Sequence, residues 1–228
     1  MTQTDRYRTP KDMSTEIPVF PLQGCILLPR ATLPLNVFEP RYLKMIDDVV
    51  SSHRLVGIVQ PAAAAGARES PAGKSVPLRA IGCAGRLTAF EELADGRLAI
   101  VLTGVCRFEI EDEISTMMPY RMVHASYHRF AHDLERGAGE GEIDRGALLA
   151  TLKAYLQAKR LQADWGAVED AGSELLVNAL SIMSPYGAEE KQALLEAATL
   201  KERAAVLHAL SQIELAAGPG GETRGRLQ

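Results

Sequence analysis

Residues 17–42 limit the folds open to this chain more than any other segment, because they set five prolines within apolar runs. A proline has no backbone N–H, so a strand that contains one loses a rung of its hydrogen-bond ladder. The strands expected here cover 19–22, 25–28 and 35–38, and they must be short, bent or placed at a sheet edge. Pro40 suits the first turn of a helix, and apolar residues recur behind it at helical spacing through Val49. The segment predicts a small, strongly curved sheet followed by one early helix.

A predicted hairpin and a change in the spacing of apolar residues indicate the secondary structure of the rest of the chain. Asp95-Gly96 suits the positive φ angles of a two-residue hairpin turn, so residues 87–93 should pair antiparallel with residues 98–103. Residues 105–114 alternate as a half-buried strand does. Beyond residue 146 the apolar period becomes about 3.6, which is typical of helices. The helices expected there cover 148–156, 175–183, 188–197 and 199–215, and the last opens on a capping-box pattern.

These patterns divide the chain into parts. We expect a disordered tail over 1–16, a β lobe over 17–130, a polar linker over 131–146, a helical lobe over 147–217 and a disordered tail over 218–228. Residues 61–77 are rich in Ala, Gly, Ser and Pro, which favours a long loop between two strands. The run of strands followed by a run of helices predicts an α+β fold.

The motifs of the first lobe resemble those of a known family, the LON substrate-binding domain, which is the N-terminal domain of ATP-dependent Lon proteases. The family's first strand, turn and helix start are matched here by Phe20-Pro21-Leu22, Leu28-Pro29 and Phe38-Glu39-Pro40-Arg41-Tyr42. Its later strands and C-terminal helices are matched by 81–87, 95–108 and 189–196, so the resemblance covers roughly 17–215. It implies a PUA-like, curved antiparallel β lobe (a pseudo-barrel) followed by a helical bundle.

The resemblance also implies a function. In Lon proteases this domain precedes an ATPase module and a Ser-Lys protease module, and this chain ends near the last family-like helix. We therefore expect no enzymatic activity and no cofactor, but a module that binds unfolded or partner polypeptide, with a separate protease or chaperone as a further partner. Apolar patches or sheet edges near residues 28–34, or the groove between the lobes, would hold an extended peptide. The partner-binding residues expected are Leu28, Arg30, Leu33, Glu39 and Arg41.

Composition argues against several other classes of protein. The net charge of −4 gives no broad basic surface for nucleic acid or for an anionic membrane. No apolar run approaches the ~20 residues that a membrane-spanning helix needs, and residues 1–16 lack the apolar core of a signal peptide. These features favour a cytoplasmic protein. The three cysteines form no CxxC pair, which argues against a disulfide framework.

Two other functions stay open at this stage. RNA binding would need basic side chains, such as Arg30, Arg41, Arg79 and Arg86, to cluster beside an exposed aromatic ring, and the acidic balance disfavours it. A small hydrolase would need the thiol of Cys25, which follows a turn, to lie beside a base such as His53. Cys83 and Cys106 fall within apolar strand patterns, where buried thiols are inert.

Three further motifs resemble functional sites but can be explained by structure alone. Gly73-Lys74-Ser75 ends like a phosphate-binding loop, but Arg68 stands where that loop needs its first glycine, so no nucleotide site is expected. The histidines at 124, 128 and 132 would line one face of a helix about 6 Å apart, close enough to share a metal. On a strand the first two would stand ~13 Å apart.

The periodicity around these histidines fits both a helix and a strand, and the family resemblance places 119–129 in the last strand, so no metal site is expected. Glu39 and Arg41 are interpreted first as a cap and ion pair that fix the start of the early helix, and a role in lining a binding surface is the alternative. Phe38 and Tyr42 are expected in the core.

Overall fold

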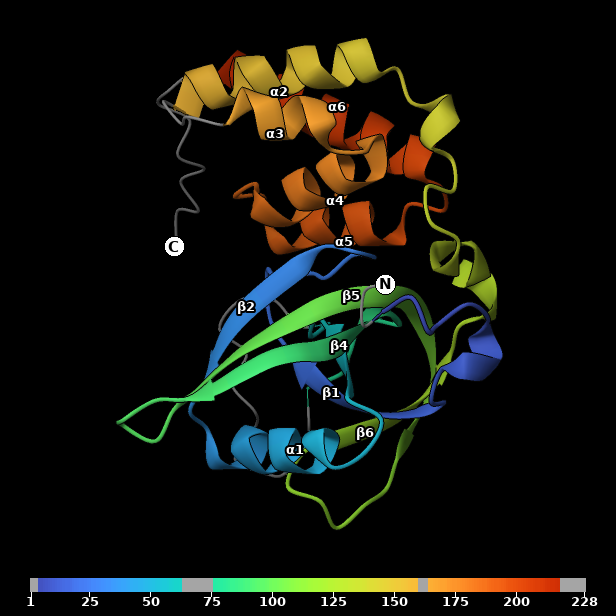
Figure 1. Ribbon diagram of the computed structural model, residues 1–228, viewed down its shortest axis with the longest axis vertical. Coiled ribbons are helices and arrows are strands. Elements are labelled where there is room, and N and C mark those ends of the chain that lie inside the picture. Colours follow the sequence, from blue (N-terminus) through green and yellow to red (C-terminus); the bar gives the residue numbers. More distant parts are fainter. Residues whose placement is uncertain (1–3, 63–75, 160–163, 218–228) are drawn as a thin grey trace, which may run out of the picture.

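The chain forms two lobes that stack along the long axis of the molecule, as the computed structural model shows (Figure 1). The structure describes residues 4–62, 76–159 and 164–217. The β lobe contains β1 (Glu16–Pro21), β2 (Thr32–Val37), α1 (Pro40–Val50), β3 (Leu55–Val59), β4 (Ile81–Glu92), β5 (Leu98–Ile114) and β6 (Arg121–Ser126). The helical lobe contains α2 (Arg145–Lys159), α3 (Trp165–Asp170), α4 (Ser173–Met183), α5 (Ala188–Glu196) and α6 (Leu200–Ala217). Short 3-10 helices are η1 (Pro10–Asp12), η2 (His128–Leu134) and η3 (Glu140–Glu142). The predicted α+β class is confirmed.

The six strands form one sheet in the order β2-β5-β4-β3-β1-β6. β6 pairs with β1 and also with the far end of the long strand β5, so the ladder of hydrogen bonds returns to β5 and encloses the core. The β1–β3 pair is parallel, whereas every other pair between these strands is antiparallel. The expectation of a purely antiparallel lobe is therefore wrong for that pair. The chain reaches β3 from β1 through β2 and α1, a crossover long enough to restart a strand in the same direction.

Pro34 and Pro18 lie at positions where their missing N–H removes no hydrogen bond between strands. β2, which contains Pro34, pairs with β5 alone and forms an edge of the sheet. Pro18 lies in β1 just before the β1–β3 pairing begins at Val19. The expected strand over 25–28 is wrong: this stretch is buried in part but is not assigned to a strand.

The predicted antiparallel β4–β5 hairpin is confirmed, but its register differs from that of a two-residue turn: Glu92 lies opposite Leu98, and an irregularity between Leu87 and Ala89 places Leu87 opposite Leu102. The turn is longer than predicted. Gly96 N donates to Leu93 O and Leu93 N donates to Arg97 O, and Gly96 alone in this turn has a positive φ, of 79°. A type I turn closed by a left-handed glycine gives this pattern, so Asp95 does not need the strained conformation of a two-residue loop.

α1 covers one end of the β lobe with its apolar face. Pro40 occupies its first turn, and Tyr42, Met45, Ile46 and Val49 are buried, as the helical spacing predicted. The Tyr42 ring stacks on Phe20 with centroids 4.1 Å apart. Phe38 was expected in the core but is 65% exposed, because it follows the last residue of β2 and precedes the N-cap residue of α1.

The N-terminal residues are tied to the β lobe, so the expected disordered tail over 1–16 is wrong from Thr4 onward. Tyr7 and Met13 are buried in the main core. Arg86 donates to the Tyr7 hydroxyl at 3.0 Å. Asp12 closes a capping box around Thr9 at the start of η1. Two apolar side chains and a cap are enough to hold a short polar segment.

The helical lobe packs around α6, which contacts α2, α4 and α5. Thr199 caps this helix by accepting from Glu202 N at 3.1 Å, as the capping-box pattern predicted. The predicted helices appear as α2, α4, α5 and α6, and α3 was missed because its six residues lack an apolar period. α4 and α5 face the β lobe (Figure 1). None of the helices in the described ranges combines the length and apolar content that crossing a bilayer requires.

Candidate functional site

The turn between β1 and β2 is one of the places at which the β lobe meets the helical lobe. Ala31 N donates to Leu28 O at 3.2 Å across Pro29 and Arg30. Arg30 has a φ of 64°, a left-handed conformation that costs a non-glycine residue roughly 1–2 kcal/mol. Arg30 N donates to Gly104 O and Gly104 N donates to Ala31 O, which is the pattern of a β-bulge whose first residue is left-handed. The strained turn aims the Arg30 side chain at the helical lobe.

Arg30 joins the two lobes through an ion pair. Its Nε donates to Glu174 Oε2 at 2.7 Å, its Nη2 donates to the other carboxylate oxygen, and its Nη1 donates to Asp133 O at 2.8 Å. Glu174 lies in the first turn of α4 and also accepts from Gly137 N at 3.2 Å. A bidentate arginine–carboxylate pair fixes direction as well as distance. It therefore sets where α4 lies on the β lobe.

A second arginine, Arg107 of β5, is almost fully buried at the same junction. It donates twice to the Asp133 carboxylate, at 2.8 Å each, and to Leu195 O at 3.0 Å near the end of α5. Burial alone would raise the pKa of Asp133, but the hydrogen bonds and charge of Arg107 outweigh it and hold that pKa below its ordinary value. The carboxylate stays ionised and neutralises the buried guanidinium.

A third contact comes from α4 and α6. Asn178 donates to Pro29 O at 3.0 Å and accepts from Arg203 Nη1 at 2.8 Å. Burial and then the nearby charge of Arg107 lower the pKa of Arg203 to about 10. We call the following set the interlobe junction: Arg30, Arg107, Asp133, Glu174, Asn178 and Arg203. Its charged side chains bond one another or backbone carbonyls, so it holds the lobes together and offers little to a ligand.

The structure separates the five residues predicted to contact a partner. Leu28 has no exposed surface and Leu33 is 8% exposed, so both belong to the core and their prediction as contact residues is corrected. They were predicted from an apolar turn, and sequence alone cannot tell an apolar turn that is buried from one that is exposed. Arg30 belongs to the interlobe junction.

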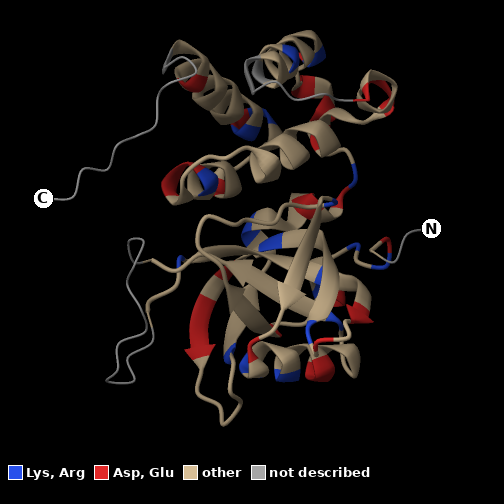
Figure 2. Cartoon of the chain, turned by 90° about the vertical axis from the view of Figure 1, so that its left-hand side faces the viewer, with Lys and Arg blue, Asp and Glu red and all other residues tan. Residues whose placement is uncertain are grey.

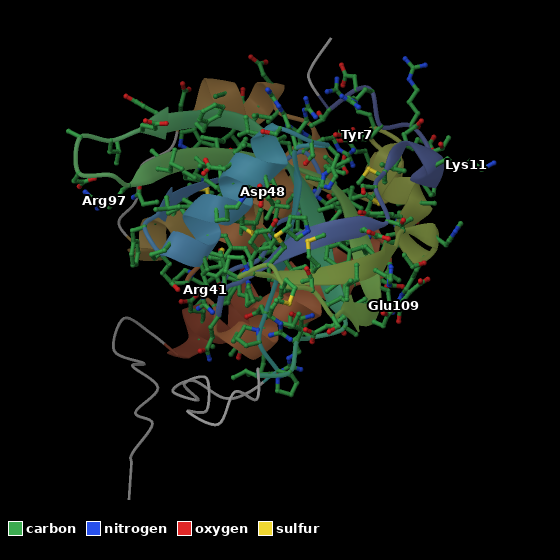
Figure 3. The ribbon with its side chains drawn as sticks, turned by 90° about the horizontal axis from the view of Figure 1, so that it is seen from below. Tyr7, Lys11, Arg41, Asp48, Arg97 and Glu109 are labelled. Carbon is green, nitrogen blue, oxygen red and sulfur yellow. The ribbon has the colours of Figure 1, made fainter. Side chains whose placement is uncertain are left out.

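Glu39 and Arg41 remain at the surface beside the start of α1. Arg41 Nε donates to Glu39 Oε2 at 2.9 Å, and its guanidinium lies 4.7 Å from the centre of the Tyr42 ring. Figure 3 shows Arg41 at one end of α1 and Asp48 further along it. The pair flanks the exposed Phe38, so charge and apolar surface lie together at this corner.

A cleft of about 420 Å³ runs across β2, β5 and β4. It is lined by three cross-strand rows: Pro34, Val101 and Ala89; Leu35, Ile100 and Phe90; Asn36, Ala99 and Glu91. Phe90 is 48% exposed, an unusual position for a phenylalanine in a strand. We call this surface the β2–β5–β4 cleft. Sequence analysis missed Phe90 and Phe38 because a phenylalanine in an alternating strand is expected to face the core.

The free edge of β2 borders this cleft. Gly104 N donates to Ala31 O, and backbone groups alternate in direction along a strand, so residues 33, 35 and 37 bond β5. The backbone of Thr32, Pro34 and Asn36 therefore faces away from β5. Pro34 has no N–H to leave unpaired there, while Asn36 presents both an N–H and a carbonyl.

The three histidines at spacing four do not share one element. His124 lies in β6, whereas His128 and His132 lie in η2. His124 Nδ1 is 3.0 Å from the Asp112 carboxylate, and His132 Nε2 is 3.2 Å from Arg107 Nη2. Among the residues that the structure describes, no group of three or more His, Cys, Asp or Glu side chains is placed to hold a metal ion.

The candidate nucleophile lacks the expected geometry. Burial raises the pKa of the Cys25 thiol, and burial lowers the pKa of His53. The His53 ring accepts from Leu55 N at 3.0 Å through Nδ1, while the nearby charge acting on Cys25 is that of Lys191. Burial also raises the pKa of Cys83 and Cys106. The Gly73-Lys74-Ser75 motif and most of the 61–77 loop lie outside the described residues.

The four arginines that were candidates for RNA binding do not form a cluster. Arg30 pairs with Glu174, Arg41 with Glu39 and Arg79 with Glu189, while Arg86 is buried against Tyr7. Figure 2 shows Lys and Arg interspersed with Asp and Glu over both lobes. A nucleic-acid surface needs unpaired basic groups along one face, which these four do not supply.

Comparison with known proteins agrees with the two-lobe arrangement. The sequence model of the ATP-dependent protease La (LON) substrate-binding domain matches residues 16–211. This chain belongs to the LON substrate-binding domain family. Relatives of this chain include the Lon protease of Flavobacterium johnsoniae, 24% identical over 201 residues, and Lon protease 2 of Sorangium cellulosum, 26% identical over 210 residues. The matches take in 85% and 89% of this chain but only 23% and 25% of those proteins, so the chain spans about a quarter of their length.

Solved structures show the same fold. The crystal structure of the Lon N-terminal domain protein from Xanthomonas campestris is similar with a TM-score of 0.60 and 22% identity, covering 86% of this chain and 98% of that one. The N-terminal domain of the Mycobacterium avium complex Lon protease is similar with a TM-score of 0.59 and 18% identity, over the same shares of the two chains. The chain thus shares its fold with these two structures.

Proposed function

We propose that this protein is a non-catalytic module that binds extended polypeptide, and that the β2–β5–β4 cleft is where it does so. The exposure of Phe90 within the cleft, together with that of Phe38 directly after the edge strand β2, carries the proposal. An extended peptide can add a strand to an exposed edge through backbone hydrogen bonds, while apolar side chains enter neighbouring pockets. The family's description as the substrate-binding domain of an ATP-dependent protease supports a polypeptide ligand.

Charge around the cleft favours a particular class of segment. Glu91 and Glu92 are exposed on β4 and make no ion pair within the part of the chain that the structure describes. Glu39 and Arg41, which follow β2 in the chain, pair with each other. A peptide with apolar residues and a neighbouring Lys or Arg would complement both the aromatic side chains and the unpaired carboxylates.

The non-catalytic part of the proposal rests on Cys25 and His53. A nucleophilic thiol needs a lowered pKa and a base within hydrogen-bond reach. Burial raises the pKa of Cys25, and the His53 ring nitrogen is engaged by a backbone amide. Cys25 is therefore not activated as a nucleophile, and His53 is not placed to act as its base.

Titration against a permanently unfolded, carboxymethylated protein tests the proposal. Phe90→Ala should weaken binding about 10-fold or more, because a buried aromatic anchor contributes about 2 kcal/mol to an interface. Ile213→Ala is the matched control, since Ile213 is 67% exposed on α6, in the other lobe. Equal affinity of the wild type for the folded and unfolded forms, or an equal loss in both variants, would contradict the proposal.

Asn36→Pro tests the edge of β2 separately. The substitution removes the N–H of residue 36, which points away from β5 in the middle of β2, and a proline already occupies the equivalent outward position 34. The hydrogen bonds of residues 33, 35 and 37 to β5 stay in place. We expect weaker peptide binding with little loss of the free energy of unfolding. If peptide binding is unchanged in a folded Asn36→Pro protein, the peptide does not pair with β2.

A further inference from the structure

A second cleft lies on another part of the molecule, between the N-terminal segment and the interlobe junction. It has a volume of about 340 Å³, within the ~300–1,000 Å³ typical of small-molecule sites. Three chain segments meet in it: residues 4–8, the Arg30 turn with Gly104 and Val105 opposite, and residues 134–136 after η2. We call it the N-terminal cleft.

The lining of the N-terminal cleft is basic. Arg8, Arg30 and Arg136 line it together with one acidic residue, Asp5; because Glu174 already neutralises Arg30, the charges of Arg8, Arg136 and Asp5 leave a net charge of +1. This concentration of charge stands out on a chain whose net charge is −4. Low-dielectric walls strengthen the field of such a group of charges on an anion that enters.

The three guanidinium groups differ in how firmly they are engaged. Arg30 is held by Glu174 and by the Asp133 carbonyl, yet its side chain keeps 20% of its surface exposed. Arg136 pairs with Asp5 only loosely, at 3.8 Å. Arg8 forms no ion pair with any residue in the described ranges. Two of the three can therefore turn to a ligand without breaking a close ion pair.

The backbone that carries Arg8 is fixed before any ligand arrives. Tyr7, the residue before it, is 4% exposed, and Arg86 donates to its hydroxyl. Asp12 Oδ2 accepts from Arg8 N at 3.0 Å and from Thr9 N at 2.8 Å. A site whose backbone is already ordered loses less entropy when it binds. Leu134 and Val105 add an apolar part to the lining.

We propose that the N-terminal cleft binds a small molecule that carries a phosphate group. A phosphate monoester has a charge of about −1.5 to −2 at neutral pH, which the net positive charge of the lining attracts, and its three terminal oxygens suit the guanidinium groups of Arg8 and Arg136. The ligand displaces Asp5 from Arg136, and its organic part rests on Leu134 and Val105. This site lies apart from the β2–β5–β4 cleft and does not depend on the peptide-binding proposal.

Calorimetric titration of the full chain with glycerol 3-phosphate, inorganic phosphate and acetate tests this inference. We expect saturable binding of both phosphates and none of acetate. Arg8→Ala and Arg136→Ala should each weaken phosphate binding about 10-fold, as expected for the loss of a charge-assisted hydrogen bond, and Asp5→Asn should strengthen it.

Arg97→Ala is the matched control. Arg97 is an exposed arginine at the tip of the β4–β5 hairpin, paired with Asp95 and well separated from Tyr7 (Figure 3). Because Arg8 and Arg136 are exposed, their variants should unfold at the same temperature as the wild type. The inference is overturned if no phosphate binds below ~10 mM, an affinity of about 3 kcal/mol, or if Arg97→Ala weakens binding as much as Arg8→Ala does.

Discussion

The interlobe ion pair between Arg30 and Glu174 allows a test in which two substitutions at one position separate two physical effects. Arg30→Ala removes the bidentate pair and the bond to the Asp133 carbonyl, and leaves Glu174 with Gly137 N as a remaining donor. The pair is mostly buried, with side-chain exposures of 20% and 10%. Breaking a buried pair costs about 3–5 kcal/mol, so for this partly exposed one we expect a loss of about 2–3 kcal/mol in the free energy of unfolding.

Arg30→Gly removes the same bonds but relieves the backbone. The φ of 64° is strained for alanine as it is for arginine, whereas glycine adopts it freely. The glycine variant should therefore be more stable than the alanine variant by roughly 1 kcal/mol. The sign of this difference is opposite to that in an ordinary strand or helix, where glycine is the less stable residue.

Urea unfolding of both variants, followed by circular dichroism, measures these differences if the transitions keep the same slope. Arg97→Ala is the control, because its ion pair with Asp95 is exposed and should contribute less than about 1 kcal/mol. A double-mutant cycle with Glu174→Ala gives the coupling energy directly. The reasoning is wrong if Arg30→Ala costs less than about 0.5 kcal/mol, or if the glycine variant is the less stable of the two.

Three further predictions concern other parts of the chain. Gly104→Ala should destabilise the fold by about 2 kcal/mol or more in thermal or urea unfolding, because its Cβ would lie 2.0 Å from the Leu28 carbonyl oxygen; a wild-type midpoint would show that the turn can move aside. The pKa of His124 should lie above its ordinary value in an NMR titration, because of its hydrogen bond to Asp112, and Asp112→Asn should lower that pKa. A raised pKa means that the contact stabilises the fold fully below about pH 6.5, and that this stabilisation is lost as the pH rises through the pKa of the folded state. In the native protein a thiol reagent should modify Cys25 alone, since the other two thiols are buried, and reaction of all three before unfolding would refute that packing.

The strand and helix pattern of this protein could be predicted in large part from sequence, because the signals are local. The hairpin at Asp95-Gly96, the helix that begins at Pro40 and the capping box at Thr199 each depend on residues within one turn or one strand pair. The errors have local causes too. A two-residue turn and a type I turn with a following glycine share the Asp-Gly signal, and α3 is too short to show a period.

The site residues could not be predicted in the same way, since exposure depends on what the rest of the chain covers. Leu28 and Phe38 are both apolar residues near prolines, yet the first has no exposed surface and the second is 65% exposed. The helical lobe packs over the turn that holds Leu28, through Asn178 and Glu174, which are some 150 positions further along the chain. Nothing near residue 28 in sequence records that contact.

The sequence by itself determined the order of most elements, the family and the restriction of the proline-bearing strands to short, bent or edge positions, because periodicity, caps and missing N–H groups act over a few residues. Only the tertiary structure decided that β1 and β3 run parallel, that Arg30 serves the junction between the lobes, and which aromatic side chains stay exposed. Each of these depends on pairing or burial between residues far apart in the chain. The free energy that selects them comes from desolvation and from charge pairing in the folded state, which no local pattern encodes.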